Sequence, residues 1–287
     1  MRAIGVFIAI AYALSIALSL VFGLTGGAGG PLAWLRWLSM FLPAVAVAIV
    51  TATMNEPPRG RVDRLPLAWL PVALFLIPVV LHAAMLPAMY ALEGPPQWQT
   101  PPAWGPMTGS ALAGRIAVNA IVGLAIASFL SFFEEIGWRA WLLPRLAERM
   151  DARRAVVATA IVWALWHVPF QLSGIQHVDG VSPIRLALSL PLGIATAGLI
   201  LGWLWLRTES VWIVSLAHGS LNAWGQFAFR FMKDTPPEQV GRDLLVLNAG
   251  FAALLVVSIL LLSPAAASRP RPAATPLPGI RTPRRPE

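Results

Sequence analysis

Apolar stretches of about 20 residues recur along almost the whole of this 287-residue chain. A helix of that length spans the roughly 30 Å hydrocarbon core of a bilayer. Charged residues make up only 12% of the chain, about half the fraction usual in a soluble domain. The pattern predicts an all-α, polytopic membrane bundle of about eight transmembrane helices, over residues 3–23, 32–53, 67–92, 111–146, 153–172, 184–206, 210–232 and 243–262.

The basic residues alternate between the two sides of this predicted bundle. Of the 21, 14 fall on one side, four on the other and three within helices. The positive-inside rule then places both termini in the cytoplasm. This topology accounts for the net charge of +8, and the chain shows no groove-reading motif that would indicate nucleic acid as a partner. We expect a multi-pass protein of a bacterial inner membrane whose first helix is retained, since it exceeds the hydrophobic region of a typical signal peptide and no clear small-x-small cleavage site follows it.

Composition divides the chain into four parts. Residues 1–110 hold the first three helices and a proline-rich outer loop, and residues 111–232 hold four helices with intramembrane polar residues. Residues 233–262 contain the last transmembrane helix. The segment 263–287, with seven prolines and five arginines, is predicted to be a disordered cytoplasmic tail. The absence of cysteine excludes disulfides, thiolate catalysis and cysteine–metal sites.

Ionisable side chains lie where hydrocarbon is expected. Glu134, Glu135 and Arg139 fall near the end of one predicted helix, and each costs about 2.5–3.5 kcal/mol at the bilayer centre on insertion scales. His167 and His218 lie in two further helices. Glu134 and both histidines are 11 to 13 residues from an arginine at the cytoplasmic end of their helix, which is roughly 16–20 Å at 1.5 Å per residue. We therefore predict that three helices bring acid and base groups to one depth.

The spacing within each helix suggests how these groups are used. Glu135 and Arg139 are four residues apart and can form an ion pair, which leaves Glu134 free to face elsewhere. His218 and Asn222 are also four apart and share a helical face. A glutamate near a neutral imidazole can hold and deprotonate water, while histidine and asparagine supply donors for an oxyanion. The pattern predicts hydrolytic chemistry inside the membrane.

Three motifs, in this order, resemble the signature of the CPBP family, the CAAX-processing and bacteriocin-processing (Abi) intramembrane endopeptidases. They are Glu134-Glu135-x-x-x-Arg139, Trp163-x-x-x-His167 and His218-x-x-x-Asn222. The resemblance covers about residues 115–232. The chain departs from the family pattern at Trp163, where phenylalanine is usual, which leaves the role of this aromatic side chain open.

The resemblance implies a role for each of six residues: general base for Glu134, water binding for His167, an orienting ion pair for Glu135 and Arg139, and oxyanion stabilisation for His218 and Asn222. It implies a membrane-anchored peptide or protein as substrate, within the lipid bilayer. We favour a mechanism without a cofactor. Zinc or another divalent metal is the alternative, because Glu134, His167 and His218 are acceptable ligands in type and number, although the chain has no His-Glu-x-x-His motif.

Two other functions stay open at this point. A membrane transporter or proton relay also lines its path with carboxylates and histidines. A non-catalytic member of the same fold would keep the bundle without the reaction. The sequence does not indicate an oligomeric state or a particular substrate. His82 and His177 have no partner suggested by the spacing, and we expect them to be packing residues.

Overall fold

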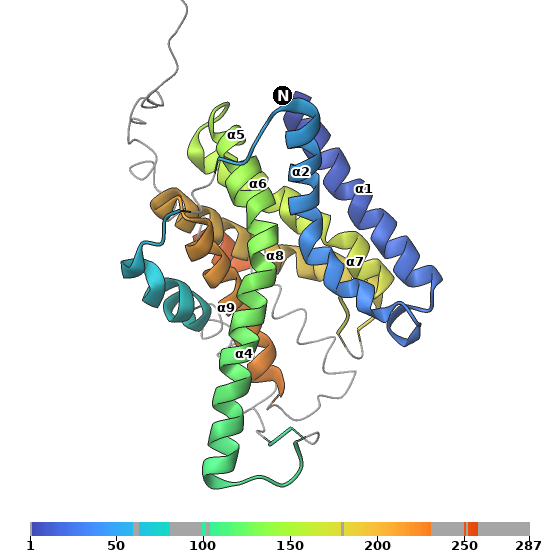
Figure 1. The fold of residues 1–287 in the computed structure, drawn as a ribbon, viewed down its shortest axis with the longest axis vertical. Helices are drawn as coiled ribbons and strands as arrows, with labels where there is room; N and C mark the ends of the chain where they lie inside the picture. The colour runs from blue at the N-terminus through green and yellow to red at the C-terminus, as the bar shows by residue number, and fades with distance from the viewer. Residues whose placement is uncertain are drawn as a thin grey trace, which may run out of the picture.

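The computed structural model describes residues 2–59, 63–80, 99–101, 104–178, 181–230, 250 and 252–257. Within these ranges the regular structure is helical and no β-strand forms, which confirms the predicted all-α class (Figure 1). The main helices are α1 (Arg2–Leu24), α2 (Leu42–Met54), α4 (Gly109–Glu135), α5 (Leu143–Ala147), α6 (Ala152–Trp166), α7 (Val168–Ser173), α8 (Pro183–Thr208) and α9 (Val211–Arg230). Short 3₁₀ or π turns are η1 (Gly27–Gly29), η2 (Ala33–Phe41), η3 (Leu67–Trp69), η4 (Val72–Leu76) and η6 (Ile136–Leu142).

Five helical segments in the described part of the chain are long and apolar enough to cross a membrane: Arg2–Leu24, Ala33–Met54, Gly109–Ala147, Ala152–Ser173 and Pro183–Thr208. The protein is therefore an integral, multi-pass membrane protein, as predicted. The helices predicted over 67–92 and 243–262 are described only in part, and both parts are helical. The predicted tail over 263–287 and His82 lie outside the described residues.

Two of the predicted helices that carry the polar residues contain local breaks. The segment 111–146 passes from α4 through the π turn η6 into α5. The segment 153–172, predicted as one helix, divides at His167 into α6 and α7. Pro169 explains this second break, because proline has no N–H to continue the backbone ladder. Both irregularities adjoin residues that the sequence singled out.

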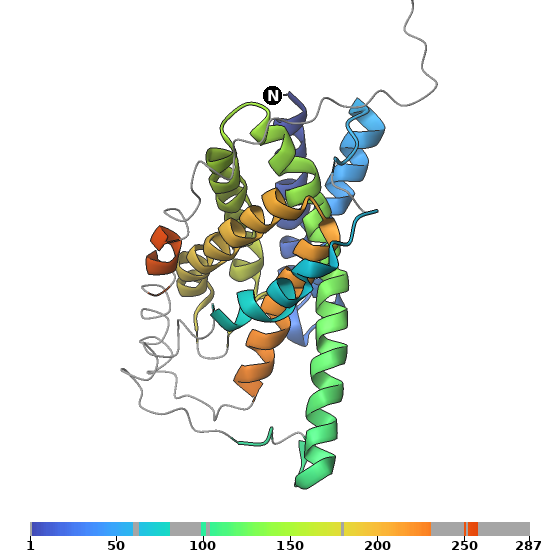
Figure 2. The same ribbon diagram turned by 90° about the vertical axis from the view of Figure 1, so that its left-hand side faces the viewer.

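Glycines allow the helices that carry the polar residues to approach closely. α4 packs against α9, and α6 against α8; Figure 2 shows the first pair in green and orange. A Cβ built on Gly219 of α9 would lie 2.4 Å from backbone atoms of Ser128 in α4. A Cβ on Gly198 of α8 would lie 2.9 Å from the Cβ of Ala160 in α6. A Cβ on Gly202, one turn further along α8, would lie 2.7 Å from Cγ1 of Val156 in α6, so the Gly198-x-x-x-Gly202 spacing serves helix packing.

A charged clasp joins the segment after α2 to η6 and to α5. The side chain of Arg145 donates a 2.8 Å hydrogen bond to Glu56, and the indole of Trp141 donates to the Glu56 carbonyl at 2.7 Å. Arg59 pairs with Glu148. The hydrogen bond from Arg145 holds the pKa of the Glu56 carboxyl below its ordinary value of 4.5. The start of α1, the end of α2 and α5 lie together at one end of the molecule (Figure 1).

Candidate active site

The ion pair expected at the end of α4 is present and fully buried. Glu135 and Arg139 are both 0% exposed, and Arg139 Nη1 donates to Glu135 Oε1 at 2.9 Å. The same oxygen is 2.8 Å from Nδ1 of His218, which reaches it from α9. Arg139 Nη2 also donates to the carbonyl of Gly198 in α8 at 3.4 Å. Glu135 therefore links α4 to α9, while Arg139 links η6, which directly follows α4, to α8.

Glu134 faces a different helix, as the one-residue offset predicted. Its side chain is buried, and Oε2 accepts a 2.8 Å hydrogen bond from the indole Nε1 of Trp163 in α6. The two neighbouring carboxylates thus have separate partners. Glu135 is engaged by two basic side chains, whereas Glu134 receives a single neutral donor from a side chain, and its second oxygen is not held by that bond.

Both histidines are held by a hydrogen bond at the same ring nitrogen, Nδ1. His167 Nδ1 lies 2.8 Å from the backbone carbonyl of Trp163, and since a carbonyl only accepts, we assign the proton to Nδ1. His218 Nδ1 lies 2.8 Å from a carboxylate oxygen and takes the same assignment. In each neutral imidazole Nε2 is then the acceptor. The two rings are held by one nitrogen and leave the other for a reactant.

Trp163 lies at the centre of these groups. Its ring meets the rings of His167 and His218 edge-on, with centroids 5.4 and 5.1 Å apart. The guanidinium carbon of Arg139 lies 4.4 Å from the ring centroid. Together with the hydrogen bond to Glu134, these contacts gather four of the six predicted residues around one indole. The structure thus brings Glu134, Arg139, His167 and His218 together from separate helices, and their roles stay predictions.

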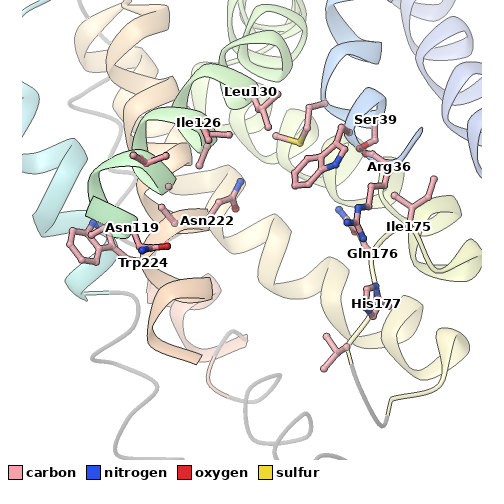
Figure 3. A pocket seen from close by; sticks show the side chains of 18 of the residues that line it. Arg36, Ser39, Asn119, Ile126, Leu130, Ile175, Gln176, His177, Asn222 and Trp224 are labelled. Atoms are coloured by element: carbon pink, nitrogen blue, oxygen red, sulfur yellow. Dashed lines mark hydrogen bonds between the residues drawn. The ribbon is translucent and has the colours of Figure 1, made fainter. Parts of the chain in front are cut away.

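Asn222 lies one turn beyond His218, in the wall of an adjoining cavity of about 840 Å³. Arg36, Gln176 and His177 lie across this cavity from it (Figure 3). The face of α4 that lines the cavity includes Ala127 and Leu130, seven and four residues before Glu134, so that all three share one side of the helix. The cavity therefore leads along α4 toward Glu134, and His177 belongs to its wall rather than to a packed interior.

The three residues considered as metal ligands do not form a ligand cluster. Among the described residues, which include Glu134, His167 and His218, no three histidine or carboxylate side chains are grouped closely enough to hold a metal ion. One oxygen of Glu134 is bound by Trp163 instead. The donor set in this arrangement does not fit the zinc site considered as the alternative, and we derive no step through a metal.

Two of the site contacts that were not predicted from the sequence differ in the signal that the sequence held for them. One is the carbonyl of Gly198, an acceptor that no side-chain motif can indicate. The other is the indole N–H of Trp163, for which the sequence did hold a signal. The usual phenylalanine at this position has no donor, so the departure from the family pattern marked the residue that makes the additional hydrogen bond.

Comparison with known proteins identifies the same region. Residues 116–224 match the family model described as type II CAAX prenyl endopeptidase Rce1-like. The CAAX prenyl protease 2 of Methanococcus maripaludis is 29% identical over 119 residues, which are 41% of this chain and 44% of that protein. The alignment thus spans less than half the length of this relative. The matched range of the family model includes all six predicted site residues and Trp163.

Proposed function

We propose that this protein is an intramembrane endopeptidase of the CPBP family that hydrolyses a peptide bond of a membrane-anchored protein or peptide, which the match of residues 116–224 to the type II CAAX prenyl endopeptidase Rce1-like model supports. One observation carries the proposal: within the described part of the chain, Glu134 is a buried carboxylate with a single neutral side-chain donor, and it shares Trp163 with two imidazoles. A purely structural carboxylate at this depth would be expected to pair with a cation, as its neighbour Glu135 does.

In the proposed reaction, Glu134 removes a proton from a water molecule, and that water attacks the carbonyl carbon of the scissile bond. Nε2 of His167 is a suitable acceptor for the second hydrogen of the same water, because its Nδ1–H is occupied by the Trp163 carbonyl. Glu134 then passes its proton to the leaving amine. The reaction is a hydrolysis, with one water consumed and no net change at the protein.

The negative charge that develops on the carbonyl oxygen needs donors. His218 can supply one when it carries a second proton, because Nδ1–H remains on Glu135 while Nε2–H becomes a donor. Glu135 accepts from Nδ1 of this imidazole, and Arg139 keeps the Glu135 carboxylate in place. The amide of Asn222 adds a neutral donor from the cavity side. We propose that the cavity receives the substrate segment next to the scissile bond.

The test compares wild-type protein with Glu134→Gln in proteoliposomes. The first probes are internally quenched peptides ending in a Cys-aliphatic-aliphatic-X sequence, with and without an S-farnesyl group, because the relative is named a CAAX prenyl protease. We expect no cleavage by the variant and full cleavage by the matched control Glu209→Gln, which removes an exposed carboxylate. Normal turnover by Glu134→Gln would overturn the base assignment.

The substrate need not be prenylated, and a second arm addresses this directly. Membranes from cells that express the wild type or Glu134→Gln are compared by proteomics for peptides cut only by the wild type. If neither arm yields a cleavage product, and proteoliposomes instead show a solute or proton flux that the variant lacks, the protein is a transporter.

We further propose a bacterial inner-membrane location with both termini cytoplasmic. The charged clasp, the start of α1 and α5 share one end of the molecule, which supports placing them on one side of the bilayer. Because the chain has no cysteine, single cysteines at residues 2 and 153 can be labelled by a membrane-impermeant maleimide. Labelling of intact cells at either position would contradict this orientation.

A further inference from the structure

We propose that Trp163 is a positioning residue that fixes the carboxylate of Glu134, holding Oε2 through its indole N–H so that Oε1 is the oxygen that takes the proton from water. The inference rests on the proposed function, in which Glu134 is the base. It assigns a role that phenylalanine, the usual residue of the family motif, cannot fill.

The indole is immobilised on several sides. Trp163 is 3% exposed, the guanidinium of Arg139 lies over its ring, and His218 meets the ring edge-on. Opposite α6, Gly198 leaves room for it: a Cβ at that position would lie 3.2 Å from Cε3 of the indole. A ring confined in this way keeps its N–H pointed in one direction. Because the donor is fixed in place, the 2.8 Å hydrogen bond fixes the orientation of the Glu134 carboxylate.

The same residue also positions His167. The backbone carbonyl of Trp163 accepts from Nδ1 of the imidazole at 2.8 Å, while the side chain of Trp163 donates to Glu134. Trp163 thus positions Glu134 and His167, the two proposed partners of the attacking water. A substitution that keeps the backbone and an aromatic ring but lacks the N–H would release only the carboxylate.

Three other indoles in the described part of the chain make a different kind of bond. The N–H groups of Trp141, Trp166 and Trp224 donate to the backbone carbonyls of Glu56, Ala11 and Leu74. These bonds join segments of the main chain. The N–H of Trp163 is directed instead to an ionisable side chain that no cation pairs with, which sets it apart as part of the site.

The experiment removes the N–H and keeps the ring. Residue 163 is replaced by benzothienylalanine, an isostere with sulfur in place of N–H, and in parallel by phenylalanine (Trp163→Phe). Because the benzothienyl ring cannot hold Oε2 of Glu134, we expect kcat to fall about 10- to 100-fold with KM unchanged. The matched control Trp141→Phe removes a buried N–H that bonds to a carbonyl outside the site, and it should keep kcat within about twofold.

A double-mutant cycle separates positioning from a general structural role. Glu134→Asp shortens the side chain by one methylene, which withdraws the carboxylate from the indole. We expect the benzothienylalanine substitution to cost nothing further in that background. An additive loss, or a loss in KM rather than kcat, would overturn the proposal.

An infrared difference spectrum provides a readout that needs no substrate. The carboxylate stretching band of Glu134, identified by its loss in Glu134→Gln, should shift when residue 163 lacks the N–H and should not shift in Trp141→Phe. An unshifted band refutes the hydrogen bond. If Glu134→Gln cleaves normally while the band shifts, the contact is real and the proposed function is what fails.

Discussion

The substitution Gly219→Ala tests whether the site depends on the close packing of α9 against α4, which this glycine allows. A Cβ at this position would be 2.4 Å from Cα, N and Oγ of Ser128. An unstrained carbon contact needs about 3.4 Å or more, so Gly219→Ala must push the two helices apart by about 1 Å. His218 is the adjacent residue, and its 2.8 Å bond to Glu135 would stretch to about 3.8 Å, beyond hydrogen-bonding distance.

Two measurable losses follow from this displacement. Overpacking of a helix interface costs about 1–3 kcal/mol, which lowers the unfolding temperature in detergent. A shift of about 1 Å in a catalytic group costs about 100-fold in kcat. The control is Gly114→Ala in α4, where a Cβ meets nothing within 4 Å and helix propensity improves.

A second substitution decides whether the backbone contact is responsible. Two of the three atoms closest to the new Cβ belong to the backbone of Ser128, so Gly219→Ala combined with Ser128→Ala should remain impaired. Recovery of activity in this double variant would show that only the hydroxyl was in the way. Wild-type cleavage by Gly219→Ala alone would refute the reasoning, since the helices would then have parted without consequence for His218.

Three further predictions concern the carboxylates and the metal alternative. Glu135→Gln should lower the unfolding temperature strongly, because it leaves Arg139 buried without its counter-charge at a cost of about 3–5 kcal/mol, whereas Glu134→Gln should unfold at nearly the wild-type temperature; equal losses would contradict this assignment. Because the folded protein lowers the pKa of Glu56, the bond between Glu56 and Arg145 stabilises the protein at pH values above the ordinary pKa of 4.5. This stabilisation is lost as the pH falls through the lower pKa of the folded state. Glu56→Gln should therefore show a smaller drop in unfolding temperature than the wild type between about pH 7 and about pH 3. Dialysis against a chelator should leave cleavage unchanged; loss that zinc restores would support the metal-dependent mechanism instead.

Much of the site could be predicted because the position of a residue along a membrane helix gives its depth in the bilayer. Each helix rises by the same distance per residue, and each has an arginine at its predicted cytoplasmic end. The depths of Glu134, His167 and His218 therefore follow from the number of residues that separate each of them from that arginine. The pairing of Glu135 with Arg139 follows from their spacing. What counting does not give is rotation about each helix axis, which is set by packing between helices. The contact of His218 with Glu135, rather than Glu134, depends on that rotation.

The local breaks in the helices were less predictable. Pro169 signalled an interruption, but a proline in a membrane helix can also be tolerated as a kink. The π turn η6 has no comparable signal in the residues Ile136–Leu142. It follows directly after the two glutamates, where Gly137 lies so close to Pro43 of α2 that an added Cβ would be 2.5 Å away. This close approach between helices distant in sequence is a tertiary contact that a local pattern cannot show.

The helix end at His167 makes its ring orientation a property of the main chain. The backbone N–H of His167 bonds to Ala164, in a tightened last turn, and the Trp163 carbonyl is left for the imidazole. No side-chain substitution can remove that acceptor, so His167 keeps its tautomer as the residues around it diverge in evolution. His218 takes its tautomer from the Glu135 side chain and would lose it with one codon change. The two imidazoles therefore differ in how readily mutation can disable them.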